Sequence, residues 1–116
     1  MTSIRDGVRV IVDGVRRGAI VDTFERWYAD DVEMSENGAD PCVGKDANRE
    51  REQAFAASVA AWHGAEAHAV VIEGDRAAIE WTLDFTPKGG ARSAIRQMSL
   101  QTWRDGKVVR EAFYHG

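Results

Sequence analysis

The sequence predicts an α+β fold in which helices come first and an antiparallel sheet follows. Apolar residues recur at helical spacing in the first half of the chain, whereas apolar and polar residues alternate in the second half. Strands grouped after helices, rather than alternating with them, are typical of α+β proteins. A curved sheet wrapped around the helices, with a cavity between them, satisfies this order.

Length and composition indicate a single globular domain, residues 1–116. The hydrophobic fraction is 44%, and 4 Trp, 4 Phe and 2 Tyr spread along the chain argue against disorder. A formal net charge of −4 disfavours a nucleic-acid partner. Because no run approaches the roughly 18 apolar residues of a membrane helix, we expect no membrane partner either.

Three helices are expected in the first half. The first begins at Ser3, a capping residue, and ends near Gly18; its inner stripe is Ile4, Val8, Ile11 and Val15. The second covers residues 20–27. The third begins at Asp46, a good N-cap, and ends at Gly64. Its expected inner face is Ala47, Arg51, Ala54, Phe55, Ser58, Val59 and Trp62.

A short strand, residues 32–36, and a loop, residues 37–44, separate the second helix from the third. The rest of the chain predicts a meander of four strands. Its strands contain residues 70–72, 79–86, 93–103 and 108–115, and its turns lie at 74–75, 87–90 and 105–106.

Several short stretches of the sequence are typical of one protein family. They are Gly18, the segment WYADDV at 27–32, GKD at 44–46, EWTL at 80–83, WRDGKVV at 103–109 and FY at 113–114. With them the whole chain resembles the nuclear-transport-factor-2-like superfamily of cone-shaped α+β barrels, and within it the SnoaL-like and ketosteroid-isomerase-like group. That superfamily includes isomerases, polyketide cyclases, epoxide hydrolases, dehydratases and members without catalysis, so the fold alone does not define the chemistry.

The resemblance to ketosteroid isomerases holds at one catalytic position and fails at two. The position of their aspartate base, five residues after an Asp-Asp pair, is Glu36 here, counted from Asp31. Their oxyanion-hole tyrosine falls at Ile11 or Val12, and their neutral acid falls near Ser99. Neither position offers a strong donor, and such donors contribute about 3–4 kcal/mol each. Efficient isomerisation of a ketosteroid is therefore not expected.

The same resemblance leaves two assignments of the sheet faces open, because a one-residue slip in register exchanges them. In the favoured assignment a polar set lines the cavity: Glu80, Thr82, Asp84, Gln97, Ser99, Gln101, Glu111, Phe113 and His115. The opposite face is then apolar and must be buried against the helices or a second subunit: Ile79, Trp81, Leu83, Phe85, Met98 and Leu100.

Four residues are candidates for acid–base catalysis: Glu36, Asp84, Glu111 and His115. Glu111 and His115 share one strand face, and a carboxylate–imidazole pair can exchange protons near neutral pH. The candidate lining residues are Tyr28, Phe55, Trp62, Glu80, Gln97, Ser99 and Phe113. The carboxylates also have a purely structural interpretation, with Glu36 in a solvated loop and Asp84 and Glu80 paired with Arg92 or Arg96 across a hairpin.

We expect neither a metal nor a cofactor. His63 and His68 do not share a helix face, Cys42 is the single cysteine, and the glycines do not match a dinucleotide fingerprint. The alternating charges of residues 49–52 indicate a solvated helix face.

The sequence thus predicts a cytoplasmic, SnoaL-like protein that binds a small, partly apolar organic molecule and forms a homodimer through the sheet face. Cofactor-free acid–base catalysis by such a protein as an isomerase, cyclase or hydrolase remains open. The alternative is a non-catalytic ligand-binding or dimerisation domain.

Overall fold

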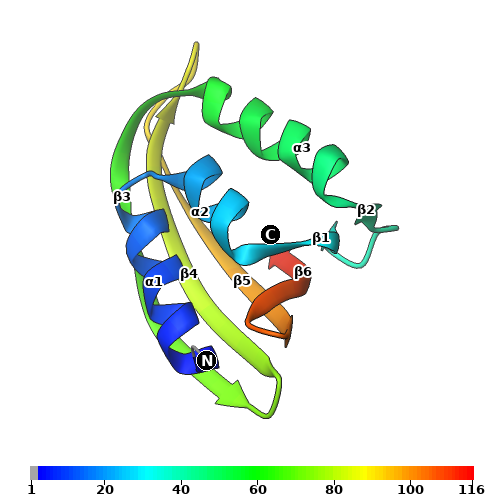
Figure 1. Ribbon diagram of the computed structural model, residues 1–116. Coiled ribbons are helices and arrows are strands. Elements are labelled where there is room, and N and C mark those ends of the chain that lie inside the picture. The colour runs from blue at the N-terminus through cyan, green and yellow to red at the C-terminus, as the bar shows by residue number, and fades with distance from the viewer. Residues whose placement is uncertain (1–2) are drawn as a thin grey trace.

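The computed structural model describes residues 3–116, which form three helices and one curved sheet of six strands (Figure 1). In chain order the elements are α1 (Ile4–Arg16), α2 (Ile20–Trp27), β1 (Tyr28–Glu36), β2 (Cys42–Val43), α3 (Lys45–Ser58), β3 (Val59–Glu73), β4 (Arg76–Pro87), β5 (Ser93–Arg104) and β6 (Lys107–His115). The predicted α+β class and the curved sheet around the helices are confirmed.

The first helix begins and ends where the sequence predicts. The Ser3 side chain accepts a hydrogen bond from the backbone N–H of Asp6 at 3.1 Å, which satisfies one free donor of the first turn. At the other end Gly18 has a φ of +77°, a left-handed conformation that glycine adopts readily. The chain can therefore turn directly into α2.

The sheet has the strand order β2-β1-β6-β5-β4-β3. All neighbouring strands are antiparallel except β1 and β6, which run parallel. The sheet is thus mixed, whereas the sequence predicted an antiparallel one. The two-residue strand β2 lies in the predicted loop, where Val43 pairs with Glu33 of β1.

The third helix differs from its prediction at both ends and in its inner face. It ends at Ser58, and Trp62 lies in β3. Its one fully buried residue is Asn48, and Asn48, Glu52 and Phe55 lie at helical spacing on one side. The predicted inner face also contained Ala47, Arg51 and Ala54, and these three residues are exposed.

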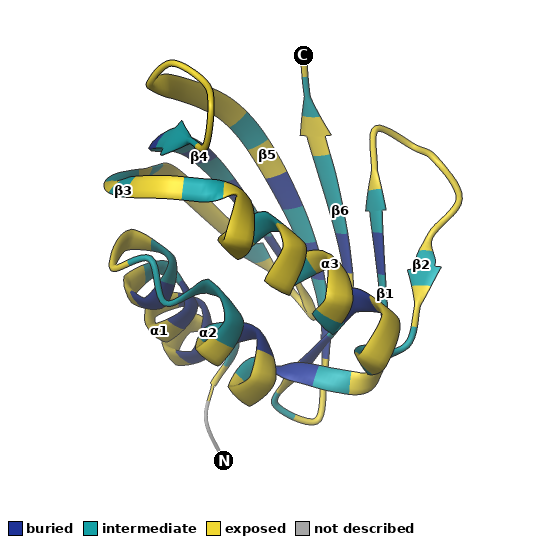
Figure 2. Ribbon diagram, turned by 90° about the horizontal axis from the view of Figure 1, so that it is seen from above, coloured by how far each residue is buried: buried dark blue, intermediate teal, exposed yellow. Residues whose placement is uncertain are grey.

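The core lies between the concave side of the sheet and the helices α1 and α2, as Figure 2 shows by the dark-blue positions where these layers meet. Its buried side chains come from both layers: Val8, Ile11, Phe24, Tyr28, Val32, Met34, Ala77, Ile79, Trp81, Trp103 and Val108. No helix within residues 3–116 is long and apolar enough to cross a membrane.

Candidate functional site

A cavity of about 360 Å³ opens between the helices and the concave face of the sheet. It is lined by Ile11, Val15, Ile20, Thr23, Phe24, Tyr28, Glu36, Arg51, Glu52, Phe55, Trp62, Trp81, Leu83, Gln97, Gln101, Glu111 and Phe113. A mostly apolar wall with a few polar groups is typical of a site for a small organic molecule. The sequence analysis predicted eight of these residues for the cavity or its catalytic groups: Tyr28, Glu36, Phe55, Trp62, Gln97, Gln101, Glu111 and Phe113.

The register between β4 and β5 determines which side chains face the cavity. Trp81 lies opposite Gln97, and Ile79 lies opposite Ser99, so these four side chains share the concave face. The predicted polar face is therefore correct for β5 but wrong for β4, whose concave face is apolar. Ser99 is buried, but it accepts a hydrogen bond from the Trp81 indole at 3.2 Å and does not line the cavity.

Glu80 and Asp84 lie on the convex face of the sheet, which corrects their expected place in the cavity. Asp84 receives two hydrogen bonds from Arg92 at 3.0 and 2.8 Å, and Arg92 holds the pKa of Asp84 below its usual value. Glu80 forms an ion pair with Arg96 at 3.4 Å. These are the structural roles that the sequence had left open for both carboxylates.

Glu111 is the carboxylate at the floor of the cavity, and its side chain is held on both oxygens. The Tyr28 hydroxyl donates to Oε1, and Nε2 of Gln101 donates to Oε2 at 3.0 Å. The Trp103 indole donates to Oε1 of Gln101 at 3.0 Å, which directs the amide nitrogen toward Glu111. Strand β1 thus supplies one donor, and β5 supplies the other.

Burial raises the pKa of Glu111 above that of an ordinary glutamate, although its hydrogen bonds oppose the shift. Burial, together with the nearby Glu111, raises the pKa of Tyr28 as well, so Tyr28 stays a phenol and a donor. Each oxygen of Glu111 still has a lone pair not used by these donors. Glu111 can therefore take up a proton while it remains in place.

Glu52 is a second carboxylate of the cavity, and the sequence analysis had placed it on a solvated helix face. Desolvation by burial raises its pKa to about 7, and the negative charges of Glu111 and Glu36 add to the shift, while Arg51 opposes it. A group with this pKa gives and accepts protons at neutral pH. The spacing of Glu52 from Asn48 and Phe55 was the signal that could have identified it.

The rim of the cavity carries a charged cluster around Glu36. One oxygen of Glu36 lies 3.5 Å from a guanidinium nitrogen of Arg51, and the other lies 3.8 Å from Nε2 of His115. The Glu36 side chain is 51% exposed. The structure thus places His115 beside Glu36, and not in the predicted pair with Glu111.

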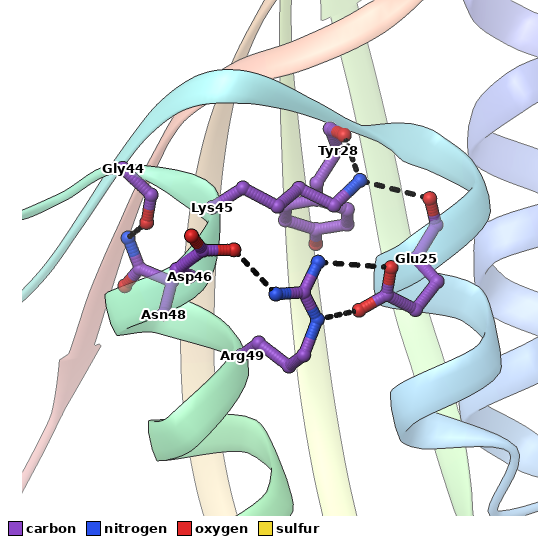
Figure 3. A network of polar contacts seen from close by, with 7 residues as sticks. All are labelled: Glu25, Tyr28, Gly44, Lys45, Asp46, Asn48 and Arg49. Carbon is purple, nitrogen blue, oxygen red and sulfur yellow. Dashed lines mark hydrogen bonds and ion pairs between the residues drawn. The ribbon is translucent and has the colours of Figure 1, made fainter.

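Helix α3 is held over the cavity by polar contacts at its first turns (Figure 3). Nζ of Lys45 donates to the backbone carbonyls of Glu25 and Tyr28, near the C-terminus of α2 where carbonyls lack helical partners. The Arg49 guanidinium pairs with Glu25 and with Asp46. Asn48 donates to the carbonyls of Val32, Cys42 and Gly44. These contacts orient Glu52 and Phe55 toward the sheet.

Aromatic rings form the wall of the cavity beneath the far end of α3. Phe55 meets Trp62 edge to face, and Trp62 stacks on Phe85 with centroids 5.9 Å apart. The Trp62 indole also donates to the backbone carbonyl of Arg16 at 3.2 Å. A Cβ added at Gly18 would lie 2.8 Å from the Trp62 ring, so only glycine fits beneath it.

The SnoaL-like domain family matches residues 8–111. The chain belongs to the SnoaL-like family, and its fold is NTF2-like. The match begins within α1 and ends within β6, and it includes the cavity residues from Ile11 to Glu111.

Solved structures share the SnoaL-like fold over nearly their whole length. A candidate SnoaL-like polyketide cyclase from Mesorhizobium loti is 25% identical, with a TM-score of 0.84 over 98% of this chain and 100% of that one. An NTF2-like protein of unknown function from Burkholderia pseudomallei is 13% identical, with a TM-score of 0.84 over 100% of this chain and 92% of that one. A candidate isomerase from Bacillus subtilis is 17% identical, with a TM-score of 0.79 over 96% of this chain and 84% of that one. No curated protein matches this chain.

Neither Tyr28 nor Glu111 stands at the base, tyrosine or acid position of the ketosteroid comparison. Ile11, at the compared tyrosine position, lines the cavity as an apolar residue. Within residues 3–116 no group of three His, Cys, Asp or Glu side chains is placed to hold a metal ion. The chemistry that the arrangement offers is proton transfer by carboxylates in an apolar surrounding.

Proposed function

We propose that this SnoaL-like domain binds a small organic molecule in the cavity and catalyses a cofactor-free proton transfer on it, with Glu111 as the acid–base group. One observation carries the proposal: a buried carboxylate, held by Tyr28 and Gln101, lines an otherwise largely apolar cavity. A carboxylate in such surroundings is a stronger base than in water, because burial disfavours its charge. Isomerisation, cyclisation and hydrolysis all contain proton transfers of this kind.

Glu52 is the second group of the proposed reaction. With a pKa of about 7 it exists in both protonation states at neutral pH. When protonated, it can donate its own proton to another atom of the ligand or to a leaving oxygen, while Glu111 holds the proton that it has removed. Glu36, the base position of the ketosteroid comparison, is half exposed and paired with Arg51, so we assign it to the rim rather than to proton abstraction.

Native mass spectrometry of the purified protein tests binding. We expect a retained small molecule, and we expect Leu83→Trp to displace it because Leu83 lines the cavity. Val43→Trp is the control, since Val43 is 61% exposed and does not line the cavity. Equal retention by both variants would place the molecule elsewhere.

Deuterium uptake from heavy water, followed by NMR on small aryl ketones, tests the proton transfer without knowledge of the natural product. We expect the protein to accelerate exchange at the carbon beside the carbonyl, and Glu111→Gln to lower that rate by a factor of roughly 10²–10⁴. Glu80→Gln on the convex face is the control. An undiminished rate in Glu111→Gln would remove Glu111 as the base, and no acceleration by the wild type would favour a binding role without catalysis.

We also propose a homodimer formed through the convex face of the sheet. That face carries an apolar patch, here called the convex patch: Val71, Ala78, Met98, Leu100, Ala112 and Tyr114. Met98 and Tyr114 are cross-strand neighbours, 41% and 48% exposed. Exposed apolar patches of this kind support association. The patch is smaller than the sequence analysis expected, because the apolar residues of β4 face the helices instead.

A further inference from the structure

We propose that the ligand of the cavity is an organic ammonium ion, a protonated or quaternary nitrogen on an apolar skeleton. This inference rests on the proposed function, since it names the class of molecule that the same cavity takes. Two observations support it: the charges of the residues that line the cavity, and the aromatic rings among those residues.

The charges of the cavity do not balance within the protein. Its charged lining residues are Glu36, Arg51, Glu52 and Glu111. Arg51 and Glu36 form an ion pair with each other at the rim, 3.5 Å apart. Glu52 and Glu111 remain, and within residues 3–116 no other cationic side chain lines the cavity. Two carboxylates in a partly desolvated space are offset either by protons or by a cationic ligand.

The two remaining carboxylates differ in their partners, and this difference indicates where the cation would lie. Glu111 already accepts hydrogen bonds from Tyr28 and Gln101. Glu52 has no such hydrogen bond from a group within residues 3–116, and its pKa is set by burial and by the charges of Glu111, Arg51 and Glu36. A cationic ligand nitrogen would therefore be attracted most strongly to the Glu52 carboxylate, with Glu111 as the more distant negative charge.

Aromatic side chains supply the second part of an ammonium site. Phe24, Tyr28, Phe55, Trp62, Trp81 and Phe113 line the same space. Ring faces attract a cation electrostatically, and the attraction is stronger where water is excluded. Apolar rings and two carboxylates together favour a cation over an anion, and they favour it over a neutral molecule of equal size.

Phenethylamine and phenethyl alcohol are suitable probes because they share one skeleton and differ in an ammonium against a hydroxyl group. Isothermal titration calorimetry on the intact protein measures both affinities. We expect the amine to bind about tenfold more tightly than the alcohol at pH 7.5. We expect Glu52→Gln to remove this preference by lowering the affinity for the amine. Glu50→Gln, an exposed glutamate of the same helix, is the control.

Proton linkage provides a readout that a merely structural Glu52 would not give. The groups facing Glu52 are Glu111 and Tyr28, which form the cavity floor, Glu36 at the rim, and Arg51 on its own helix. A cation stabilises ionised Glu52, so the affinity for the amine should rise about tenfold from pH 6 to pH 8, while the amine itself stays protonated. At pH 7 binding should release about half a proton per ligand, and Glu52→Gln should abolish that release.

The possible results separate this inference from the proposed function. Tight binding of the amine with proton release supports both. Equal binding of the two probes, or preference for the alcohol, overturns the ammonium assignment and leaves the cavity as a site for neutral molecules. Binding of neither probe counts against both proposals.

Discussion

The Tyr28 hydroxyl donates a hydrogen bond to Glu111 across 83 residues of sequence. It joins the first residue of β1 to the middle of β6, the one parallel pair of strands in the sheet. Both residues are buried, at 7% and 4% exposure. The floor of the cavity therefore contains a polar contact inside the hydrophobic core. Buried polar groups of this kind need hydrogen-bond partners, because an unpaired one destabilises the core.

Tyr28→Phe should lower the free energy of unfolding by about 1–3 kcal/mol, because Glu111 loses a donor while it stays buried. The pKa of Glu111 should rise further, since that donor favours the ionised form. Urea unfolding and NMR of the carboxyl carbon measure the two effects. Tyr114→Phe on the convex face should change neither, and a pKa of Glu111 that stays the same in Tyr28→Phe would contradict the assignment.

The stability of the protein should fall as the pH rises from about 4.5 to 7. Burial raises the pKa of Glu52 from 4.5, the value of an unperturbed glutamate, to about 7, so in this interval the folded state holds a proton that the unfolded state has released. Glu52→Gln should flatten the fall and stabilise the protein at pH 8 by about 1–3 kcal/mol relative to wild type. Urea unfolding at pH 5 and pH 8 checks this, and Glu50→Gln should behave as wild type.

Gly18→Ala should be more destabilising than Gly38→Ala, although both glycines have a φ of +77°. The left-handed conformation costs roughly 1–2 kcal/mol at either position. Only at Gly18 would the new Cβ meet Trp62, whereas nothing lies within 4 Å at Gly38. We expect an additional loss of about 1–3 kcal/mol and altered tryptophan fluorescence in Gly18→Ala alone. Equal losses would show that Trp62 moves aside freely.

Light scattering at micromolar concentration should give twice the 12.8 kDa of one chain. Leu100→Glu places a charge in the convex patch and should yield monomers without loss of the fold. Val43→Glu, at an exposed position outside the patch, should remain dimeric. A wild-type mass of one chain would refute the homodimer, and a dimeric Leu100→Glu would place the interface elsewhere.

Local patterns in the sequence predicted three helices and the succession of the longer strands along the chain, but not the end of α3 or the strand β2. Ser3 and Gly18 delimit α1 by capping and by a left-handed turn, which depend on neighbouring residues only. The turn at Asp105 and Gly106 has positive φ at both residues, as expected for a two-residue hairpin between β5 and β6. Capping and turn signals depend only on residues that are close in the sequence, so the sequence alone is enough to recognise them.

The faces of the sheet and the second carboxylate depended on contacts between distant elements. Alternation along β4 shows that two faces differ, but only its register against β5, with Trp81 opposite Gln97, shows which one meets the helices. Glu52 follows two charged residues and precedes two polar or small ones, a pattern typical of solvent exposure. It faces the cavity because Lys45, Asn48 and Arg49 orient α3 through partners on other segments. The sequence by itself determined which elements form; packing between elements far apart in the chain decided which side chains are removed from water, and hence which carboxylates can exchange protons at neutral pH.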